Sequence, residues 1–193
     1  DPAIRAELQA IAEDDVQRMD RLISDISEAS RVDSELTRTR FEPIDIGCMI
    51  EQIVTARDAR PSRHQLERGV SLAYARPRKG VAIVMGEDMR LARVLDNLID
   101  NAISFSPDGG VVEIVATVTG QQVLIRVRDD GPGVAEHDRE AIFHRFHTNR
   151  PLNSGPNLER HSGLGLAIAR TIVQGHLGKI EVLGREDGLS GAV

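Results

Sequence analysis

Two asparagines lie one helical turn apart at the edge of an apolar run. If residues 88–103 form a helix, the apolar side chains gather on one arc: Leu91, Val94, Leu95, Leu98, Ala102 and Phe105. Asn is a poor helix former, so helix propensity does not explain the pair. A neutral carbonyl oxygen is a hard ligand for Mg²⁺, which takes its charge balance from substrate phosphates. We therefore predict that Asn101 is a metal ligand and Asn97 its phosphate-side neighbour; the competing interpretation is two surface amides with local hydrogen bonds.

A carboxylate follows a strand with alternating polarity at residues 122–128. Asp129 is in phase with three apolar residues, Val123, Ile125 and Val127, so it is aimed inward. Burying a carboxylate is costly unless a group donates hydrogen bonds to it, and the amino group of adenine is such a donor. Gly131 and Gly133 follow, and glycine lets a flat ring approach the backbone closely. The segment predicts a purine site; the alternative is a plain turn capped by Asp129.

Two glycines open a predicted helix further along the chain. The free N–H groups and the dipole of a helix that starts at Gly163 and Gly165 favour an anion such as a phosphate chain, although packing glycines have the same sequence. Residues 146–161 before it are rich in turn formers and too long for a simple connection, which is typical of a lid. The order and spacing of the three segments indicate an ATP site.

Several elements must position these residues. We expect helices near 47–59, 88–103, 136–145 and 164–176, and strands near 70–75, 81–85, 111–118, 122–128 and 179–183. This order favours an α+β fold, with an antiparallel-dominated sheet and helices on one face.

The N-terminal part has a different pattern. Residues 4–38 contain no Gly or Pro, and apolar residues recur at alternating spacings of three and four: Val16, Met19, Ile23 and Ile26. This pattern predicts a long amphipathic helix suited to a bundle. The segment FEPIDIG at 41–47 ends it, because Pro43 cannot continue a helix. We place a domain boundary near 40, with domains at 1–40 and 41–193.

Composition excludes several classes of protein. The 193 residues carry a net charge of −6 with a pI near 5.5, which argues against a nucleic-acid-binding face. Cys48 is the only cysteine, so the chain has neither a disulfide framework nor a clustered-cysteine metal site, which favours a reducing compartment. Its apolar runs are too short to span a bilayer. We expect a soluble, cytoplasmic chain without membrane contact of its own.

Taken together, the motifs resemble the catalytic ATP-binding domain of sensor histidine kinases, within the superfamily of gyrase B, Hsp90 chaperones and mismatch-repair ATPases. NLIDNAISFS resembles the asparagine box, DDGPG the first glycine box, AIFHRF the phenylalanine box and SGLGLAIAR the second glycine box. VQRMDRLISDISEASRVD resembles the second helix of the dimerisation and phosphotransfer hairpin. The segments HSGLGL and FHTNRP resemble those of the ChvG/ExoS type of bacterial sensor kinase.

The resemblance implies a two-layer α/β sandwich of the Bergerat type, with a mixed, largely antiparallel sheet preceded by a long amphipathic helix. It implies that Asn101 coordinates Mg²⁺, that Asn97 approaches the phosphates of ATP and that Asp129 binds the adenine amino group. Phe105 stands where an aromatic near the base is common. Further residues would line the nucleotide or hinge the lid: Gly131, Gly133, Gly163, Leu164, Gly165 and Leu166.

The sequence also departs from the family pattern. Ser104 replaces a common phosphate-binding Lys, and Thr148 stands where Arg is frequent, so we expect Arg150 to supply the lid cation and to act with Asn97 in catalysis. The chain stops at Val193 just as a last strand should begin, so we expect that strand to be short or missing. No histidine has the setting of the family's phosphoacceptor, which we therefore expect on a preceding helix outside this chain.

The implied activity is transfer of the γ-phosphoryl group of ATP to that histidine, for relay to an aspartate in the receiver domain of a response regulator. The resemblance also implies a homodimer through the hairpin, in the cytoplasmic part of an inner-membrane sensor. As an isolated fragment the chain should lack autophosphorylation. Two alternatives stay open: an ATP hydrolase of the gyrase B/Hsp90-like type, and a nucleotide-binding module without catalysis. Hydrolases of this superfamily have a water-activating Glu four residues before the metal-binding Asn. This chain has Asn97 at that position, and an amide cannot act as a general base.

Overall fold

The computed structural model describes residues 40–147 and 163–184. The elements follow in the order β1 (Glu42–Asp45), α2 (Ile46–Ala59), α3 (Arg63–Arg68), β2 (Ser71–Ala75), β3 (Ile83–Gly86), α4 (Asp88–Phe105), β4 (Val111–Thr119), β5 (Gln122–Arg128), the 3₁₀ helices η1 (Glu136–Asp138) and η2 (Ala141–Phe143), and α5 (Gly165–Gly175). The long helix predicted over residues 4–38, and with it the N-terminal domain, lies outside the described residues. In the part of the chain that the structure describes, no helix has the length and apolar character to cross a bilayer.

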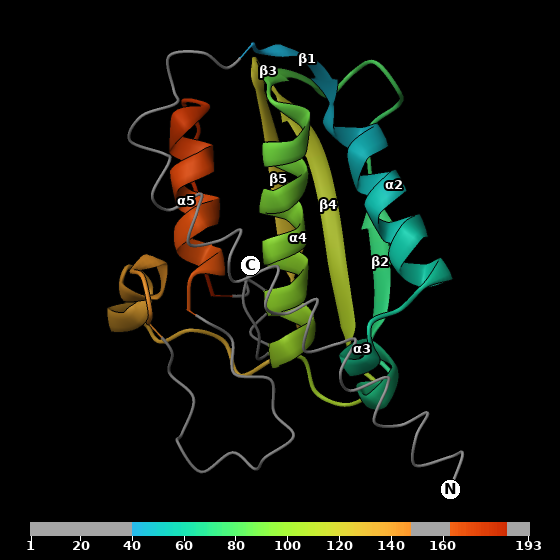
Figure 1. Cartoon of the computed structure of the whole chain (residues 1–193), viewed down its shortest axis with the longest axis vertical. Coiled ribbons are helices and arrows are strands. Elements are labelled where there is room, and N and C mark those ends of the chain that lie inside the picture. The colour runs from blue at the N-terminus through green and yellow to red at the C-terminus, as the bar shows by residue number, and fades with distance from the viewer. Residues whose placement is uncertain (1–39, 148–162, 185–193) are drawn as a thin grey trace, which may run out of the picture.

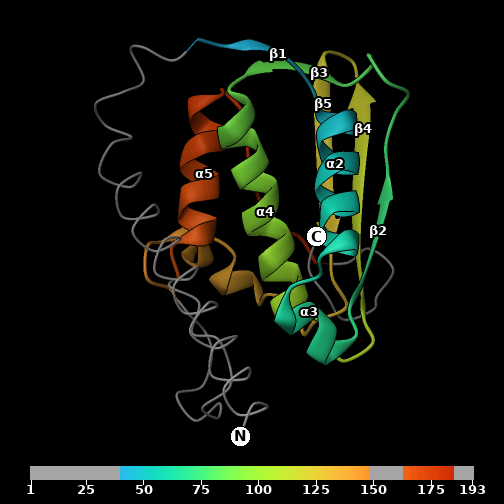
Figure 2. The same ribbon diagram turned by 45° about the vertical axis from the view of Figure 1, so that its right-hand side comes forward.

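The strands form one mixed sheet and one small ribbon. In the sheet, β4 lies between β2, to which it is parallel, and β5, to which it is antiparallel. The ribbon pairs β1 with β3 in antiparallel register. Helices α2 and α4 cover one face of the sheet, and α5 packs alongside α4 (Figures 1 and 2). The predicted α+β class with two layers is confirmed.

Helix α4 packs on two neighbours at once. Leu95, Ile99 and Ile103 lie in the main core with the sheet, and Val94 lies in a second cluster with residues of α5. The apolar stripe is wider than predicted, because Ile99 and Ile103 are buried although they lie off the predicted arc. Each such side chain contributes about 1.5–3 kcal/mol by leaving water. Two apolar contacts therefore hold the helix that carries both predicted asparagines.

An ion-pair clamp ties α4 to α2 on another flank. The guanidinium of Arg57 lies 2.6 Å from a carboxylate oxygen of Asp96 and 2.6 Å from one of Asp100. Burial alone would lower the pKa of Arg57, but the two carboxylates outweigh it and raise that pKa. The clamp fixes the middle of α4 relative to α2.

Two predicted elements are wrong. Residues 136–145 form two 3₁₀ turns instead of one α-helix, with backbone bonds such as His144 N–H to the Ala141 carbonyl. Their apolar residues are adjacent and form no helical stripe, and a short helix without such a face is marginal. Residues 179–183 belong to no strand, and only Gly184 forms an isolated bridge. A strand needs a partner for its backbone groups, and none of these residues continues a ladder among those described.

One helix was not predicted. In α3, the hydroxyl of Ser62 accepts a hydrogen bond from the Gln65 amide, and Gly69 ends the helix with a φ of 62°. Ser followed three residues later by Gln is the capping-box spacing, and glycine is the favoured residue after a helix. The signal was present in the sequence, but the helix is one of the shortest here.

Candidate nucleotide-binding site

Helix α4 brings the two asparagines to the flank that faces the start of α5. A Cβ atom added to Gly165 would lie 3.4 Å from Oδ1 of Asn97, so the two segments are in close contact. The Nδ2 group of Asn97 is buried and has no hydrogen-bond partner among the described residues. Asn101 is partly buried, one turn further on. A buried donor without an acceptor costs about 1–3 kcal/mol, so this amide suits a ligand that supplies an acceptor.

Helix α5 presents its N-terminus beside that amide. Leu164 occupies the N-cap position and is buried, and its apolar side chain makes no capping hydrogen bond. The first N–H groups of a helix have no intrahelical acceptor, and they favour an anion. Leu166 lies in the first turn and is partly buried. The donor of Asn97 and the start of α5 therefore form one electropositive corner.

The predicted purine residue is buried at the end of β5. Asp129 is 7% exposed, and its Oδ1 accepts a hydrogen bond of 2.8 Å from the Gly131 amide. The inward direction predicted from strand parity is confirmed. The protein itself supplies one of the donors that a buried carboxylate requires. A Cβ atom on Gly131 would lie 2.7 Å from the carbonyl oxygen of Phe105, so this turn packs against the end of α4.

Two other glycines in the candidate site have a positive φ. Gly133 has a φ of 76° and Gly163 a φ of 65°. The carbonyl of Gly163 accepts a hydrogen bond of 2.9 Å from the Phe146 amide, and a Cβ atom on Gly163 would lie 2.8 Å from the His147 carbonyl oxygen. Gly163 therefore packs against residues 146–147, where the segment predicted as a lid begins; residues 148–161 of that segment lie outside the described residues. No larger residue fits at position 163.

The structure thus joins three predicted segments through α4. Asn97 contacts the second glycine segment, and Phe105 contacts the first through its carbonyl. Phe105 is the last residue of α4, and its side chain is 37% exposed although the position falls on the predicted apolar arc. Arg150 lies outside the described residues. The sequence did not reveal the Gly131 donor or the unpartnered state of the Asn97 amide, because both depend on tertiary contacts.

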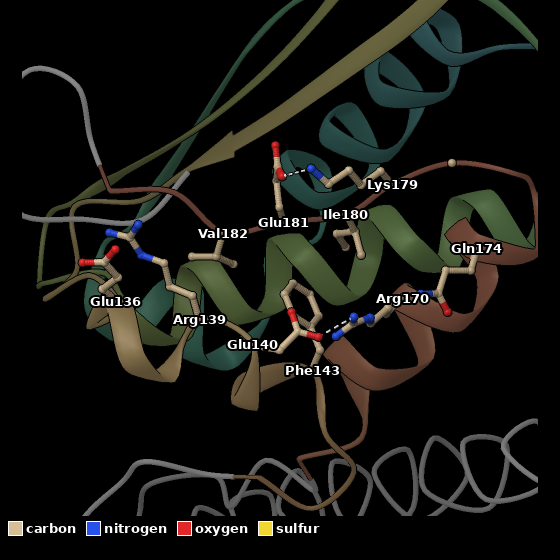
Figure 3. A pocket seen from close by; sticks show the side chains of 11 residues that line it. Glu136, Arg139, Glu140, Phe143, Arg170, Gln174, Lys179, Ile180, Glu181 and Val182 are labelled. Atoms are coloured by element: carbon tan, nitrogen blue, oxygen red, sulfur yellow. Dashed lines mark ion pairs between the residues drawn. The ribbon is translucent and has the colours of Figure 1, made fainter.

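A hollow of about 430 Å³ lies between the 3₁₀ helices, α5 and residues 178–182, away from the candidate site (Figure 3). Its charges are largely paired: Arg170 with Glu140 at 2.5 Å, and Lys179 with Glu181 at 2.5 Å. No predicted site residue lines it. The corner at Asn97 and the turn at Asp129 stay the better candidate for nucleotide chemistry.

Comparison with known proteins agrees with this arrangement. Residues 86–192 match the family described as histidine kinase-, DNA gyrase B-, and HSP90-like ATPase. The sensor protein ChvG of Agrobacterium fabrum is 37% identical over 171 residues, which are 86% of this chain and 28% of that protein. The chain therefore spans less than a third of this relative.

Two solved structures show the same fold. A crystal structure of full-length ShkA in complex with AMPPNP has a TM-score of 0.71 at 26% identity, covering 89% of this chain and 34% of that one. The mycobacterial sensor histidine kinase MprB has a TM-score of 0.61 at 25% identity, covering 79% of this chain and 92% of that one. With the two asparagines of α4, the buried Asp129 and both glycine segments in place, the chain belongs to the histidine kinase-, DNA gyrase B- and HSP90-like ATPase family, among the sensor histidine kinases.

Proposed function

We propose that the chain binds Mg²⁺-ATP and donates the γ-phosphoryl group to a histidine on a separate helical hairpin. The observation that carries the proposal is the buried Nδ2 group of Asn97, for which the described residues supply no acceptor, beside the N-terminus of α5. Phosphate oxygens are acceptors, and their charge suits a helix N-terminus. Relatives named as sensor proteins support the choice of phosphoryl transfer.

The chain's own residues position the substrate and neutralise its charge. Asp129 accepts a hydrogen bond from the purine amino group while the Gly131 amide keeps the carboxylate in place. Asn97 donates to a phosphate oxygen. Phosphoryl transfer needs little covalent chemistry from the protein, so orientation and charge stabilisation are sufficient roles. Arg150 is the cation that we assign to the transferred group.

The residues fit a magnesium ion at Asn101. Its amide oxygen is a hard, neutral ligand that adds no negative charge beside the phosphates, and the orphaned donor at Asn97 marks the same flank of α4 as polar. When bound, Mg²⁺ would neutralise charge on the phosphate chain. Asn101 would hold it, and Asn97 would stay free to donate to the substrate.

The residue type at position 97 favours phosphoryl transfer over ATP hydrolysis. A general base for water must accept a proton, and the amide of Asn97 cannot do so at neutral pH. We further propose that the receiver domain of a response regulator takes the phosphoryl group from the histidine. The whole protein would then be a homodimer at the cytoplasmic side of an inner membrane.

Mixing experiments test the proposal. The purified chain, ATP labelled in the γ-phosphate, Mg²⁺ and a separately purified hairpin that bears an acceptor histidine are combined. We expect acid-labile label on the hairpin, none when its histidine is changed to Gln, and little with Asn97→Ala. Release of free phosphate without labelled hairpin would favour the hydrolase, and calorimetry without heat from ATP would reject nucleotide binding.

A further inference from the structure

The C-terminus of α4 receives its stabilising cation from another helix. The last carbonyl groups of a helix have no intrahelical donor and carry partial negative charge, and the last turn of α4 contains no basic residue. The Nη1 group of Arg68, in α3, donates to the Ser106 carbonyl at 2.6 Å and to the Ser104 carbonyl at 3.2 Å. One guanidinium therefore caps α4 from outside.

Arg68 itself is held in place by local structure. It is the last residue of α3, between the Ser62 cap and the left-handed Gly69. Its backbone carbonyl accepts a hydrogen bond of 2.7 Å from the Gly109 amide, and its Nε lies 3.3 Å from an Asp108 carboxylate oxygen. The backbone and the side chain of Arg68 thus both bind the loop that follows α4, and these contacts restrict the position of the C-terminus of α4.

That clamped end is in contact with the turn that carries Asp129. The Phe105 carbonyl lies so close to Gly131 that a Cβ atom there would be 2.7 Å from it, and the Gly131 amide donates to Asp129. The Val111 amide, which follows the loop after α4, donates to Asp130 at 3.1 Å. Displacing the end of α4 would therefore move the Asp129 carboxylate.

We infer that Arg68 is a positioning residue for the base site: it fixes Asp129 through the end of α4 and so sets the preference for adenine over guanine. The inference rests on the proposed function. Adenine offers a donor to the carboxylate, whereas guanine presents an oxygen that the carboxylate repels. A site discriminates strongly only while its polar group is held in one position.

A variant pair tests this inference. Arg68→Met keeps the aliphatic stem and removes the guanidinium. Arg57→Met is the matched control, because it removes a guanidinium that binds α4 at a different place, the flank facing α2. Calorimetry with Mg²⁺-ATP and Mg²⁺-GTP gives the affinity ratio. We expect Arg68→Met to lower that ratio about tenfold, the effect of losing about one charged hydrogen bond, mainly through ATP, and Arg57→Met to change it less than about twofold.

A second measurement needs no nucleotide. Hydrogen exchange of the Gly131 amide should be faster in Arg68→Met than in Arg57→Met, and Arg68→Lys, which can still donate to one carbonyl, should lie between Arg68→Met and the native chain. If Arg68→Met does not fold, Arg68→Lys carries both measurements. If Arg68→Met leaves the ATP-to-GTP affinity ratio unchanged, including by weakening both nucleotides equally, the inference is overturned. The proposed function still stands in that case, provided that the native chain binds ATP. A native chain that binds neither nucleotide overturns both.

Discussion

The two ends of the candidate site differ in how completely the protein satisfies its own polar groups. At the base end, Asp129 accepts from the Gly131 amide, Asp130 accepts from the Val111 amide, and Arg68 donates to the Ser104 and Ser106 carbonyls at the end of α4. At the phosphate end, the Asn97 amide is buried without an acceptor among the described residues. One end is prebuilt, and the other is incomplete until a ligand arrives.

The difference indicates how stability and binding divide along α4. Groups at the base end should support the fold and the ligand together, because their hydrogen bonds exist without nucleotide. Groups at the phosphate end should lower the stability of the free protein slightly and raise its affinity for the ligand, because an unpaired buried donor is costly until the ligand supplies an acceptor. Variants at the two ends should therefore change stability in opposite directions.

The largest effect is expected from Asp129→Asn. The adenine amino group would lose a charged acceptor and meet a competing donor, so ATP affinity should fall by about 1.5–3 kcal/mol. Calorimetric titration with ATP measures the loss. Asp130→Asn is the control, since it makes the same charge change one residue away and keeps an acceptor for Val111. Equal affinity in Asp129→Asn and the native chain would refute the base role.

Gly131→Ala should destabilise the fold itself. The added Cβ atom would lie 2.7 Å from the Phe105 carbonyl and 2.7 Å from Asp129 Oδ1, and backbone cannot yield cheaply. Overpacking of this kind costs about 1–3 kcal/mol, measurable by urea denaturation. Gly120→Asn is the control, because that turn position has a φ of 61° and open space, and Asn tolerates a positive φ. Native stability in Gly131→Ala would show that the turn is not packed on α4.

Asn97→Ala should separate the two functions at the phosphate end. Removing the orphaned donor should raise the free energy of unfolding by up to about 1 kcal/mol, while Mg²⁺-ATP affinity falls about fivefold. Thermal denaturation and titration on the same preparation compare the two changes. Asn101→Ala should instead reduce the gain in affinity that Mg²⁺ provides. Loss of stability in Asn97→Ala would remove the contrast between the two ends.

The sequence predicted the elements that have a strong periodic pattern. Strand parity placed Asp129 inward, and the α4 pattern placed both asparagines on one edge, because side-chain direction follows directly from secondary structure. Residues 136–145 lack a periodic stripe, so the predicted helix was wrong there. The strand expected at 179–183 was also wrong, because pairing depends on a neighbour that local pattern does not specify.

Contacts between distant segments were beyond prediction. The cap that Arg68 places on α4 joins residues 36 and 38 positions apart, and no local pattern marks it. The unpartnered amide of Asn97 is likewise the outcome of packing against α5. Motif order therefore predicted the kind of site, whereas tertiary structure was needed to show which end of it is already complete.

The smallest effect is expected at another carboxylate that accepts backbone hydrogen bonds, remote from the site. Asp45 caps α2 through the Cys48 amide at 3.1 Å and accepts from the Gly80 amide at 2.6 Å. The Gly80 bond, aided by Cys48 and Gly47, outweighs burial and lowers the pKa of Asp45. Since Asn is an equally good cap, Asp45→Asn should cost only about 0.3–1 kcal/mol at pH 7, the worth of a charge at a helix N-terminus.

The pH dependence of that cost distinguishes charge from shape. Because the folded pKa of Asp45 is depressed, its charge stabilises the fold fully above about pH 4 and the contribution disappears as pH falls further. Urea denaturation of the native chain and of Asp45→Asn at pH 7 and pH 3 should therefore show a gap that closes on acidification. A gap of equal size at both pH values would mean that the amide distorts the cap. ATP affinity should not change, in contrast to Asp129→Asn, where the same chemical substitution falls inside the site.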